Sequence, residues 1–308
     1  MPELERFLVT GCAGFVGSEL CRQLLAKGNF VTGFDNLSRG TYAHMTDLLA
    51  NRNFHFIKGD IGVHLDIRAA FENNPQGVFH LAALHYIPEC IARPADTYEI
   101  NVVGTMRIWE TACQFKVAKF LFVSTGDVYR PASTPHREND ITDPFNAYGL
   151  SKFTAERALT LQRDLRSPEL IIARLFNVYG PGETNPHLLP ELLMQVRNGL
   201  RELHVGNLWP VRDFIFVSDA ASAFVRLMNA ATNPGVVNVG TGGGWSVSEI
   251  IGLISSAAGR DITAISVPER CRPIERDTLR PNIERLVEST GWKPSRSFID
   301  GLRETLAV

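Results

Sequence analysis

The sequence is poor in cysteine and close to neutral in charge. Its five cysteines are scattered, odd in number and free of any C-x-x-C pair, which argues against a disulfide framework and against a zinc site. They are Cys12, Cys21, Cys90, Cys113 and Cys271. The 31 basic and 33 acidic residues leave a net charge of −2, so a general nucleic-acid binder is not expected, although a local basic pocket for phosphate stays open.

The sequence also lacks a long apolar run and a basic leader. No run approaches the roughly 18 residues that span a membrane. The chain begins with acidic residues where a signal peptide carries basic ones. We therefore expect a soluble, cytoplasmic protein without a metal site that binds neither nucleic acid nor membrane. Its 308 residues allow two domains at about 150 residues each.

Short apolar runs alternate with helix-length segments in the first half of the chain. Strand-like runs lie at 7–9, 30–34, 54–57, 77–81 and 119–124, and helical patterns at 15–26 and from about 95 to 115. This rhythm predicts an α/β fold, a doubly wound parallel sheet of the Rossmann type with helices on both faces. Its ligand is expected at the carboxyl ends of the strands. We assign residues 1–175 to this dinucleotide-binding domain.

The alternation loosens after residue 175. Helices are predicted at 188–199 and 247–258, and a strand at 214–217. We expect residues 176–308 to form mostly a second, smaller α/β substrate domain, with a part at about 211–230 returning to the first.

A glycine-rich loop, TGCAGFVG at 10–17, follows the first strand and opens the first helix. Gly11 permits the tight turn, Gly14 lets the backbone approach a pyrophosphate, and Gly17 lets the helix sit close to the sheet. The helix N-terminus then offers free N–H groups to phosphates. The alternative is a plain tight βα turn, which the placement inside a βαβ unit disfavours.

An acidic residue follows the second strand. Asp35 can accept hydrogen bonds from the ribose hydroxyls and would repel a 2′-phosphate, which favours NAD over NADP. Arg39 nearby is the counter-argument, because an arginine suits that phosphate. Asp60, after the third strand, can meet the adenine amino group or can simply cap a helix.

Tyr148 and Lys152 lie four residues apart at the start of a predicted helix and so share one face. An ammonium beside a phenol stabilises the phenolate, which makes Tyr148 a candidate general base. Thr125, at the end of the fifth strand, can hydrogen-bond the reacting oxygen. Such a pair is common by chance, but here it follows a nucleotide-binding sheet.

Motifs along nearly the whole chain resemble the extended short-chain dehydrogenase/reductase family, specifically its nucleotide-sugar epimerases and dehydratases. They include TGCAGFVG at 10–17, FDNLSRG at 34–40, FHLAAL at 79–84, VSTGDVY at 123–129, AYGLSK at 147–152 and ARLFNVYGPG at 173–182. The resemblance implies Tyr148, Lys152 and Thr125 as the catalytic residues and a homodimer as the assembly. It further implies cofactor contacts from Gly11, Gly14, Phe15, Val16, Gly17, Asp35, Asn36, Leu37, Ser38, Arg39, Gly40, Asp60, Ile61, Leu81, Ala82, Ala83, His85, Asn101, Ser124, Tyr148, Lys152 and Phe176.

The segment at 83–94 is similar to 4-epimerases rather than to dehydratases. His85 falls where those epimerases often carry a lysine, or it is an ordinary polar loop residue. Dehydratases follow their threonine with Asp-Glu, whereas this chain has Gly126 and Asp127, and Gly126 can transfer no proton. Asp127 is a departure from a plain epimerase. It either takes part in catalysis, as a base beside a keto group, or caps a turn.

The resemblance also implies where a nucleotide-diphosphate sugar binds. The expected substrate contacts are Thr125, Asn177, His187, Leu188, Arg212, Arg272 and Glu275. A guanidinium suits phosphate oxygens, which supports Arg212 and Arg272. Arg130 has no assigned role, and Leu279 replaces a bulky tyrosine of some epimerases.

We therefore predict an NAD-dependent nucleotide-sugar 4-epimerase. The first alternative is a decarboxylase, 4-reductase or dehydratase on the same scaffold, using Asp127. The second is a dinucleotide-binding protein without catalysis, which the retained Tyr148 and Lys152 disfavour.

Overall fold

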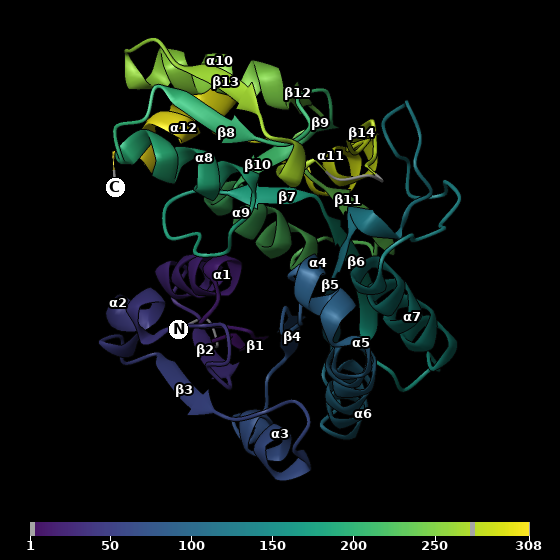
Figure 1. The fold of residues 1–308 in the computed structure, drawn as a ribbon. Coiled ribbons are helices and arrows are strands. Elements are labelled where there is room, and N and C mark those ends of the chain that lie inside the picture. The colour runs from purple at the N-terminus through teal and green to yellow at the C-terminus, as the bar shows by residue number, and fades with distance from the viewer. Residues whose placement is uncertain (1–3, 272–274, 308) are drawn as a thin grey trace.

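A seven-stranded parallel sheet forms the centre of the protein (Figure 1). The computed structural model describes residues 4–271 and 275–307. In the strand order β11-β6-β5-β4-β1-β2-β3, the strands are β1 (Arg6–Thr10), β2 (Phe30–Asp35), β3 (Phe54–Lys58), β4 (Gly77–His80), β5 (Lys119–Thr125), β6 (Glu169–Leu175) and β11 (Val236–Val239). The predicted doubly wound α/β fold is confirmed. The apolar runs predict β1 to β5 to within one residue at each end, but they do not predict β6 and β11.

Helices cover both faces of this sheet, which is why its strands are apolar on both sides. Successive residues of β1 show this, because Leu8 packs into one apolar core and Val9 into the other. The Val9 face is covered by α1 (Phe15–Ala26), α2 (Thr46–Leu49), α9 (Val217–Met228) and α11 (Glu284–Thr290). The Leu8 face is covered by α3 (His64–Phe71), α6 (Thr105–Gln114) and α7 (Ala147–Leu161).

The helical stretch predicted from about 95 to 115 is confirmed, but it contains a π-helical turn that the sequence did not predict. The structure has α5 (Pro94–Tyr98), a π-helical turn over Glu99–Gly104, and then α6. The wider turn carries Asn101 into the interior, where its side chain accepts a hydrogen bond from Leu84 N (2.8 Å) and donates to Leu84 O (2.8 Å) and to Ser151 Oγ (2.9 Å). These bonds fix the start of the loop that precedes α4 (Ile87–Ala92).

A C-terminal lobe sits above the carboxyl ends of the sheet strands (top of Figure 1). It is built from the strand pairs β7 (Asn177–Tyr179) with β10 (Phe214–Phe216) and β8 (Glu202–Val205) with β13 (Thr263–Ser266), and from β9 (Val211–Arg212) between β12 (Trp245–Ser246) and β14 (Thr278–Leu279). Three helices, α8 (Leu188–Arg197), α10 (Val247–Ala258) and α12 (Phe298–Leu306), complete a third apolar core.

The chain returns from the lobe to the main sheet. The strand predicted at 214–217 ends at Phe216, and Val217 begins α9. α9 packs against α1 through apolar residues such as Phe224 and Leu20, and β11 then adds to the sheet beside β6. Residues 217–239 therefore complete the sheet before the chain goes back to the lobe. The boundary at residue 175 stays a prediction.

Candidate active site

A cavity of about 900 Å³ lies between the carboxyl ends of the sheet strands and the C-terminal lobe. Most of the residues singled out from the sequence line it. They are Gly11, Gly14, Phe15, Val16, Gly17, Asp35, Asn36, Ser38, Arg39, Gly40, Asp60, Ile61, Leu81, Ala82, Ala83, His85, Ser124, Thr125, Asp127, Tyr148, Lys152, Phe176, Asn177, His187, Leu188, Arg212 and Glu275. Leu37 and Asn101 do not line it, and Arg272 lies outside the described residues.

The glycine-rich loop connects β1 to α1 at the floor of the cavity. Gly11 has φ +73°, and a Cβ there would lie 2.9 Å from Ala82 N. A Cβ at Gly17 would lie 2.0 Å from Gly11 O, so helix and loop touch through bare backbone. Gly14 precedes the helix without a side-chain cap, which leaves the first N–H groups of α1 directed to the cavity. This cradle fits a dinucleotide pyrophosphate.

Asp35, at the end of β2, holds this loop in place. Its Oδ2 accepts a hydrogen bond from Ala13 N (3.0 Å) and its Oδ1 accepts one from Leu37 N (2.8 Å). Burial raises the pKa of the Asp35 carboxyl, and the two backbone hydrogen bonds oppose that rise. Leu37 has φ +62° and forms part of the turn after β2, and it does not line the cavity.

Arg39 lines the cavity and pairs with Glu89, so its charge is already engaged by a carboxylate. Asn36 Nδ2 donates to Asp60 Oδ2 at 2.7 Å, and Gly62 N donates to Asp60 Oδ1 at 2.7 Å. The helix-cap interpretation of Asp60 is wrong, because α3 begins at His64 and the position before it is Val63. Asn36 and Asp60 thus form a preset polar edge beside the loop.

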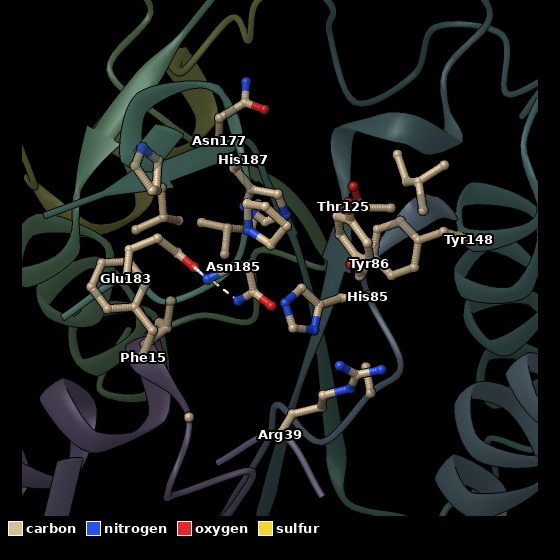
Figure 2. A pocket seen from close by; sticks show the side chains of 18 of the residues that line it. Phe15, Arg39, His85, Tyr86, Thr125, Tyr148, Asn177, Glu183, Asn185 and His187 are labelled. Carbon is tan, nitrogen blue, oxygen red and sulfur yellow. Dashed lines mark hydrogen bonds between the residues drawn. The ribbon is translucent and has the colours of Figure 1, made fainter. Parts of the chain in front are cut away.

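Tyr148 and Thr125 meet at the opposite end of the cavity (Figure 2). Thr125 ends β5, and Tyr148 stands in the first turn of α7, which Asn146 caps by accepting from Gly149 N (2.7 Å). Burial and the charge of Asp127 raise the pKa of the Tyr148 phenol well above its usual value, and a hydrogen bond with the Thr125 side chain acts against this. In this environment the phenol is neutral unless a cation joins it.

Lys152 lies one turn further along α7 and is buried. Its ammonium stands over the ring of Phe122, 4.1 Å from the ring centroid. Burial lowers the pKa of Lys152 to about 7, and the nearby carboxylate of Glu156 opposes this shift. Lysine and phenol line the same cavity, and the role of the ammonium toward Tyr148 stays a prediction.

Asp127 faces the cavity, and the turn-capping interpretation of its side chain is wrong. Thr125 is the capping residue, since its Oγ1 accepts the hydrogen bond of Asp127 N (3.1 Å). Arg276 reaches the Asp127 carboxylate at 3.6 Å from the C-terminal lobe. The Asp127 carboxylate lines the cavity, and its charge raises the pKa of Tyr148.

Two histidines that line the cavity lie beside each other (Figure 2). The rings of His85 and His187 lie 6.1 Å apart in an edge-to-face arrangement. Burial and the neighbouring His187 lower the pKa of His85, while Glu183 raises it. Glu183 accepts hydrogen bonds from Asn185 N (3.0 Å) and Asn185 Nδ2 (2.8 Å).

Residues of the lobe line the end of the cavity where the nucleotide diphosphate is expected, here called the nucleotide end. Arg212, in β9, forms an ion pair with Glu275, and Asn177 Nδ2 donates to Asp213 O (2.9 Å). Leu279 lines the cavity wall. Arg130 does not line it and instead pairs with Asp143 (3.1 Å).

The sequence interpretation missed several lining residues. Tyr86, Glu183 and Asn185 lie in loops that line the cavity. The sequence shows where these loops interrupt the helices and strands, but not where the loops lie in space. His44 was also missed; its Nδ1 lies 2.9 Å from Ala13 O and its Nε2 lies 3.0 Å from Gly182 O, so it links the phosphate loop to the lobe. Residues 4–271 and 275–307 contain no cluster suited to a metal ion and no helix long and apolar enough to cross a membrane.

Comparisons with known proteins agree with this geometry. The sequence profile of the "NAD dependent epimerase/dehydratase family" matches residues 7–240. A GDP-6-deoxy-D-mannose reductase of Pseudomonas aeruginosa is 33% identical, over 98% of this chain and 96% of that protein. A UDP-glucose 4-epimerase of Mycolicibacterium smegmatis is 33% identical, over 98% and 97%.

Solved structures extend the comparison to the fold. The UDP-glucose 4-epimerase of Thermotoga maritima with UDP-glucose superposes with a TM-score of 0.90 at 29% identity, covering 98% of this chain and 97% of that one. The UDP-glucose 4-epimerase of Thermus thermophilus in complex with NAD has a TM-score of 0.87 at 28% identity, with 98% of each chain covered.

Proposed function

The chain belongs to the NAD dependent epimerase/dehydratase family, and we propose that its reaction is the inversion of C4 in a nucleotide-diphosphate sugar. One observation carries this proposal. Thr125, Tyr148 and Lys152 line the same cavity as the glycine-rich loop and Asp35, at the carboxyl ends of parallel strands. That is where an α/β sheet binds its ligands.

The cofactor is NAD, and bound NAD supplies the chemistry of taking up and returning hydride. The phosphate loop is proposed to hold its pyrophosphate, and Asp35 its adenosine ribose. Asn36 and Asp60 are placed for the adenine. The engagement of Arg39 with Glu89 and the buried carboxylate of Asp35 both disfavour a 2′-phosphate.

The protein's own groups move one proton and hold one oxygen. Tyr148 takes the proton of the C4 hydroxyl and later returns it, while the Thr125 hydroxyl fixes the reacting oxygen. Lys152 supplies the positive charge that a buried phenol needs in order to ionise. The sugar is briefly a 4-keto sugar and turns in the cavity before C4 is reduced from its other face.

The lobe is proposed to bind the nucleotide diphosphate. Arg212 presents a guanidinium to phosphate oxygens, and Asn177, His187 and Leu188 line the adjoining wall. Glu275 is placed to accept a hydrogen bond from a ribose. A homodimer is proposed as the assembly, on the family resemblance.

A second reaction on the same scaffold is favoured by Asp127. Its carboxylate lines the cavity beside Tyr148, where a plain epimerase needs no acid or base. A reductase is among the relatives at 33% identity. A 4-reductase, decarboxylase or dehydratase that uses Asp127 is therefore the alternative proposal.

Product analysis tests both proposals. The protein is incubated with UDP- and GDP-sugars, and the products are examined by mass spectrometry and by proton NMR. An epimerase conserves the substrate mass and inverts the C4 couplings. A reductase is identified when a 4-keto sugar nucleotide, supplied together with NADH or NADPH, gains two hydrogens as the nucleotide is oxidised. Loss of carbon dioxide from a uronic-acid nucleotide identifies a decarboxylase, and loss of water a dehydratase. Any of these outcomes, without C4 inversion, would reject the 4-epimerase.

A further inference from the structure

Asp127 places a negative charge where the proposed reaction disfavours one. Its carboxylate lines the cavity and raises the pKa of Tyr148. Removal of the phenol proton creates a second negative charge beside the first, and like charges at short range oppose this. A site that keeps Asp127 therefore gains from a compensating cation.

Arg276 brings a cation to Asp127 from the C-terminal lobe. Its Nη2 donates to Asp127 O (3.1 Å) and lies 3.6 Å from Asp127 Oδ1. The side chain is 2% exposed, and its guanidinium carbon lies 4.4 Å from the ring centroid of Phe145. A guanidinium stacked on an aromatic ring and held at one edge has a fixed direction.

The same short segment touches the proposed nucleotide end. Glu275 pairs with Arg212, and Arg212 Nη1 donates to Arg276 O (3.1 Å). Arg276 N donates in turn to Glu275 Oε1 (3.0 Å). Two adjacent residues thus contact a proposed phosphate-binding arginine on one side and the carboxylate beside Tyr148 on the other.

We propose that Arg276 is a positioning residue, which holds the Asp127 carboxylate at the edge of the sugar site and offsets its negative charge beside Tyr148. The inference rests on the proposed role of Tyr148 in proton transfer. Arg276 acts through Asp127, because Arg276 itself does not line the cavity. Segment 275–276 therefore contacts both Arg212 at the proposed nucleotide end and Asp127 beside Tyr148.

Other groups among the described residues act on Tyr148 and Arg276. Asp127 and Cys90 act on Tyr148, with Lys152 one turn along α7. Burial lowers the pKa of Arg276, and Arg212 adds to this shift, whereas Asp127 and Glu275 oppose it. Arg276 in turn lowers the pKa of buried His136.

Four variants test the proposal: Arg276→Gln, Asp127→Asn, the double variant and Arg276→Lys. The first two are expected to shift the ionisation of Tyr148 in opposite directions. The readouts are the pH profile of kcat/KM on an identified sugar nucleotide and the near-ultraviolet titration of tyrosinate in the NAD-bound protein, taken as a difference against Tyr148→Phe. Arg276→Gln is expected to move the Tyr148 ionisation to higher pH by about one unit, because an unpaired carboxylate remains. Asp127→Asn is expected to move it to lower pH.

The double variant is expected to lie between the two single variants, near the wild type, and Arg276→Lys to retain part of the offset. Arg130→Gln is the matched control, since Arg130 pairs with an acid outside the cavity; its profile stays unchanged. Loss of activity in Arg276→Gln at an unshifted ionisation, or shifts of the same sign in both single variants, would overturn the proposal. If no sugar nucleotide is turned over, the proposed function fails, but the tyrosinate titration still decides the coupling.

Discussion

Tyr148 is the residue on which the proposed chemistry depends. Its half-buried phenol lines the cavity beside Thr125 and Asp127, where the proposed reaction needs a group that carries a proton. Tyr148→Phe is expected to lower kcat by a factor of about 10²–10⁴, the usual contribution of general acid–base catalysis. Binding of NAD, followed by fluorescence titration, is expected to change little, because the ring remains.

Tyr129→Phe is the matched control for that loss. Tyr129 OH donates to Asn238 Oδ1 (2.7 Å) in the interior, away from the cavity. This substitution is expected to keep kcat and to reduce the free energy of unfolding by about 1 kcal/mol. Unchanged turnover in Tyr148→Phe on every identified substrate would reject the proton-transfer role.

His136 is expected to make stability depend on pH. It is fully buried and stacks on Tyr129 with ring centroids 4.6 Å apart, and within the described residues neither ring nitrogen is hydrogen-bonded. Burial and Arg276 lower the pKa of His136 to about 4, whereas the unfolded chain protonates near pH 6.5. The unfolded state therefore binds more protons between these values, and stability is complete above about pH 6.5 and falls as the pH drops toward 4.

His136→Phe retains the stacked ring and removes this titration. Urea unfolding at pH 7 and at pH 4.5 is expected to show a smaller loss of stability in the variant than in the wild type, by roughly 2 kcal/mol. Equal losses in both proteins would show that His136 does not contribute.

At the scale of elements, the contact between α1 and the phosphate loop depends on Gly17. An added methyl would lie 2.0 Å from Gly11 O, and neither backbone can move without displacing β1 or α1. Gly17→Ala is expected to reduce the free energy of unfolding by about 1–3 kcal/mol or more, because overpacking against the backbone is destabilising. The same substitution is expected to weaken NAD binding, which calorimetry measures.

Gly252→Ala provides the comparison within a helix. Gly252 lies exposed in α10, and an added Cβ there meets nothing within 4 Å. Alanine is the better helix former, so this variant is expected to gain about 0.5–1 kcal/mol. Similar stability changes in the two variants would contradict the close approach at Gly17.

Strands β1 to β5 were predicted from the sequence and β6 and β11 were not, because the last two carry buried polar residues whose partners are distant in sequence. β1 to β5 are short runs of apolar residues between turns, so their pattern is local. β6 contains Arg174 and β11 contains Asn238, and both are buried. Arg174 Nη2 donates to Glu156 Oε2 (2.7 Å) in α7, and Asn238 accepts from Tyr129; partners so distant in sequence leave no local signal.

The same distinction holds for the site. The glycine loop, Asp35 and Thr125 could be predicted because each lies at the carboxyl end of a strand, and the fold places these ends at one edge. Tyr148 could be predicted from its spacing of four residues to Lys152 at the start of a helix. His44, Glu183 and Arg276 reach the site through long-range contacts with the phosphate loop, the lobe and Asp127. No residue spacing in the sequence predicts these contacts.

At the scale of the whole molecule, the sheet and the lobe are expected to unfold together. α9 packs on α1, and β11 completes the sheet, although both follow parts of the lobe in sequence. Thermal unfolding is expected to give one transition by circular dichroism and by tryptophan fluorescence alike. Two separated transitions would show that the lobe folds independently.

Ligand binding offers a second test at this scale. NAD is expected to raise the melting temperature, because a ligand bound only to the native state stabilises it by about 2.7 kcal/mol at one hundred times its dissociation constant. NADP at the same concentration is expected to have little effect, since Asp35 borders the site and Arg39 is paired with Glu89. Equal shifts with both nucleotides would contradict the assigned preference.

The return of the chain to the sheet has a consequence for synthesis on the ribosome. β11 lies beside β6 in the sheet but ends only at Val239, so the outer edge of β6 stays uncovered until the lobe segment between the two strands has been made. An unpaired strand edge invites pairing with other chains. Nascent chains of this protein therefore pass through an interval in which the sheet lacks β11 and the exposed edge of β6 can pair with other chains.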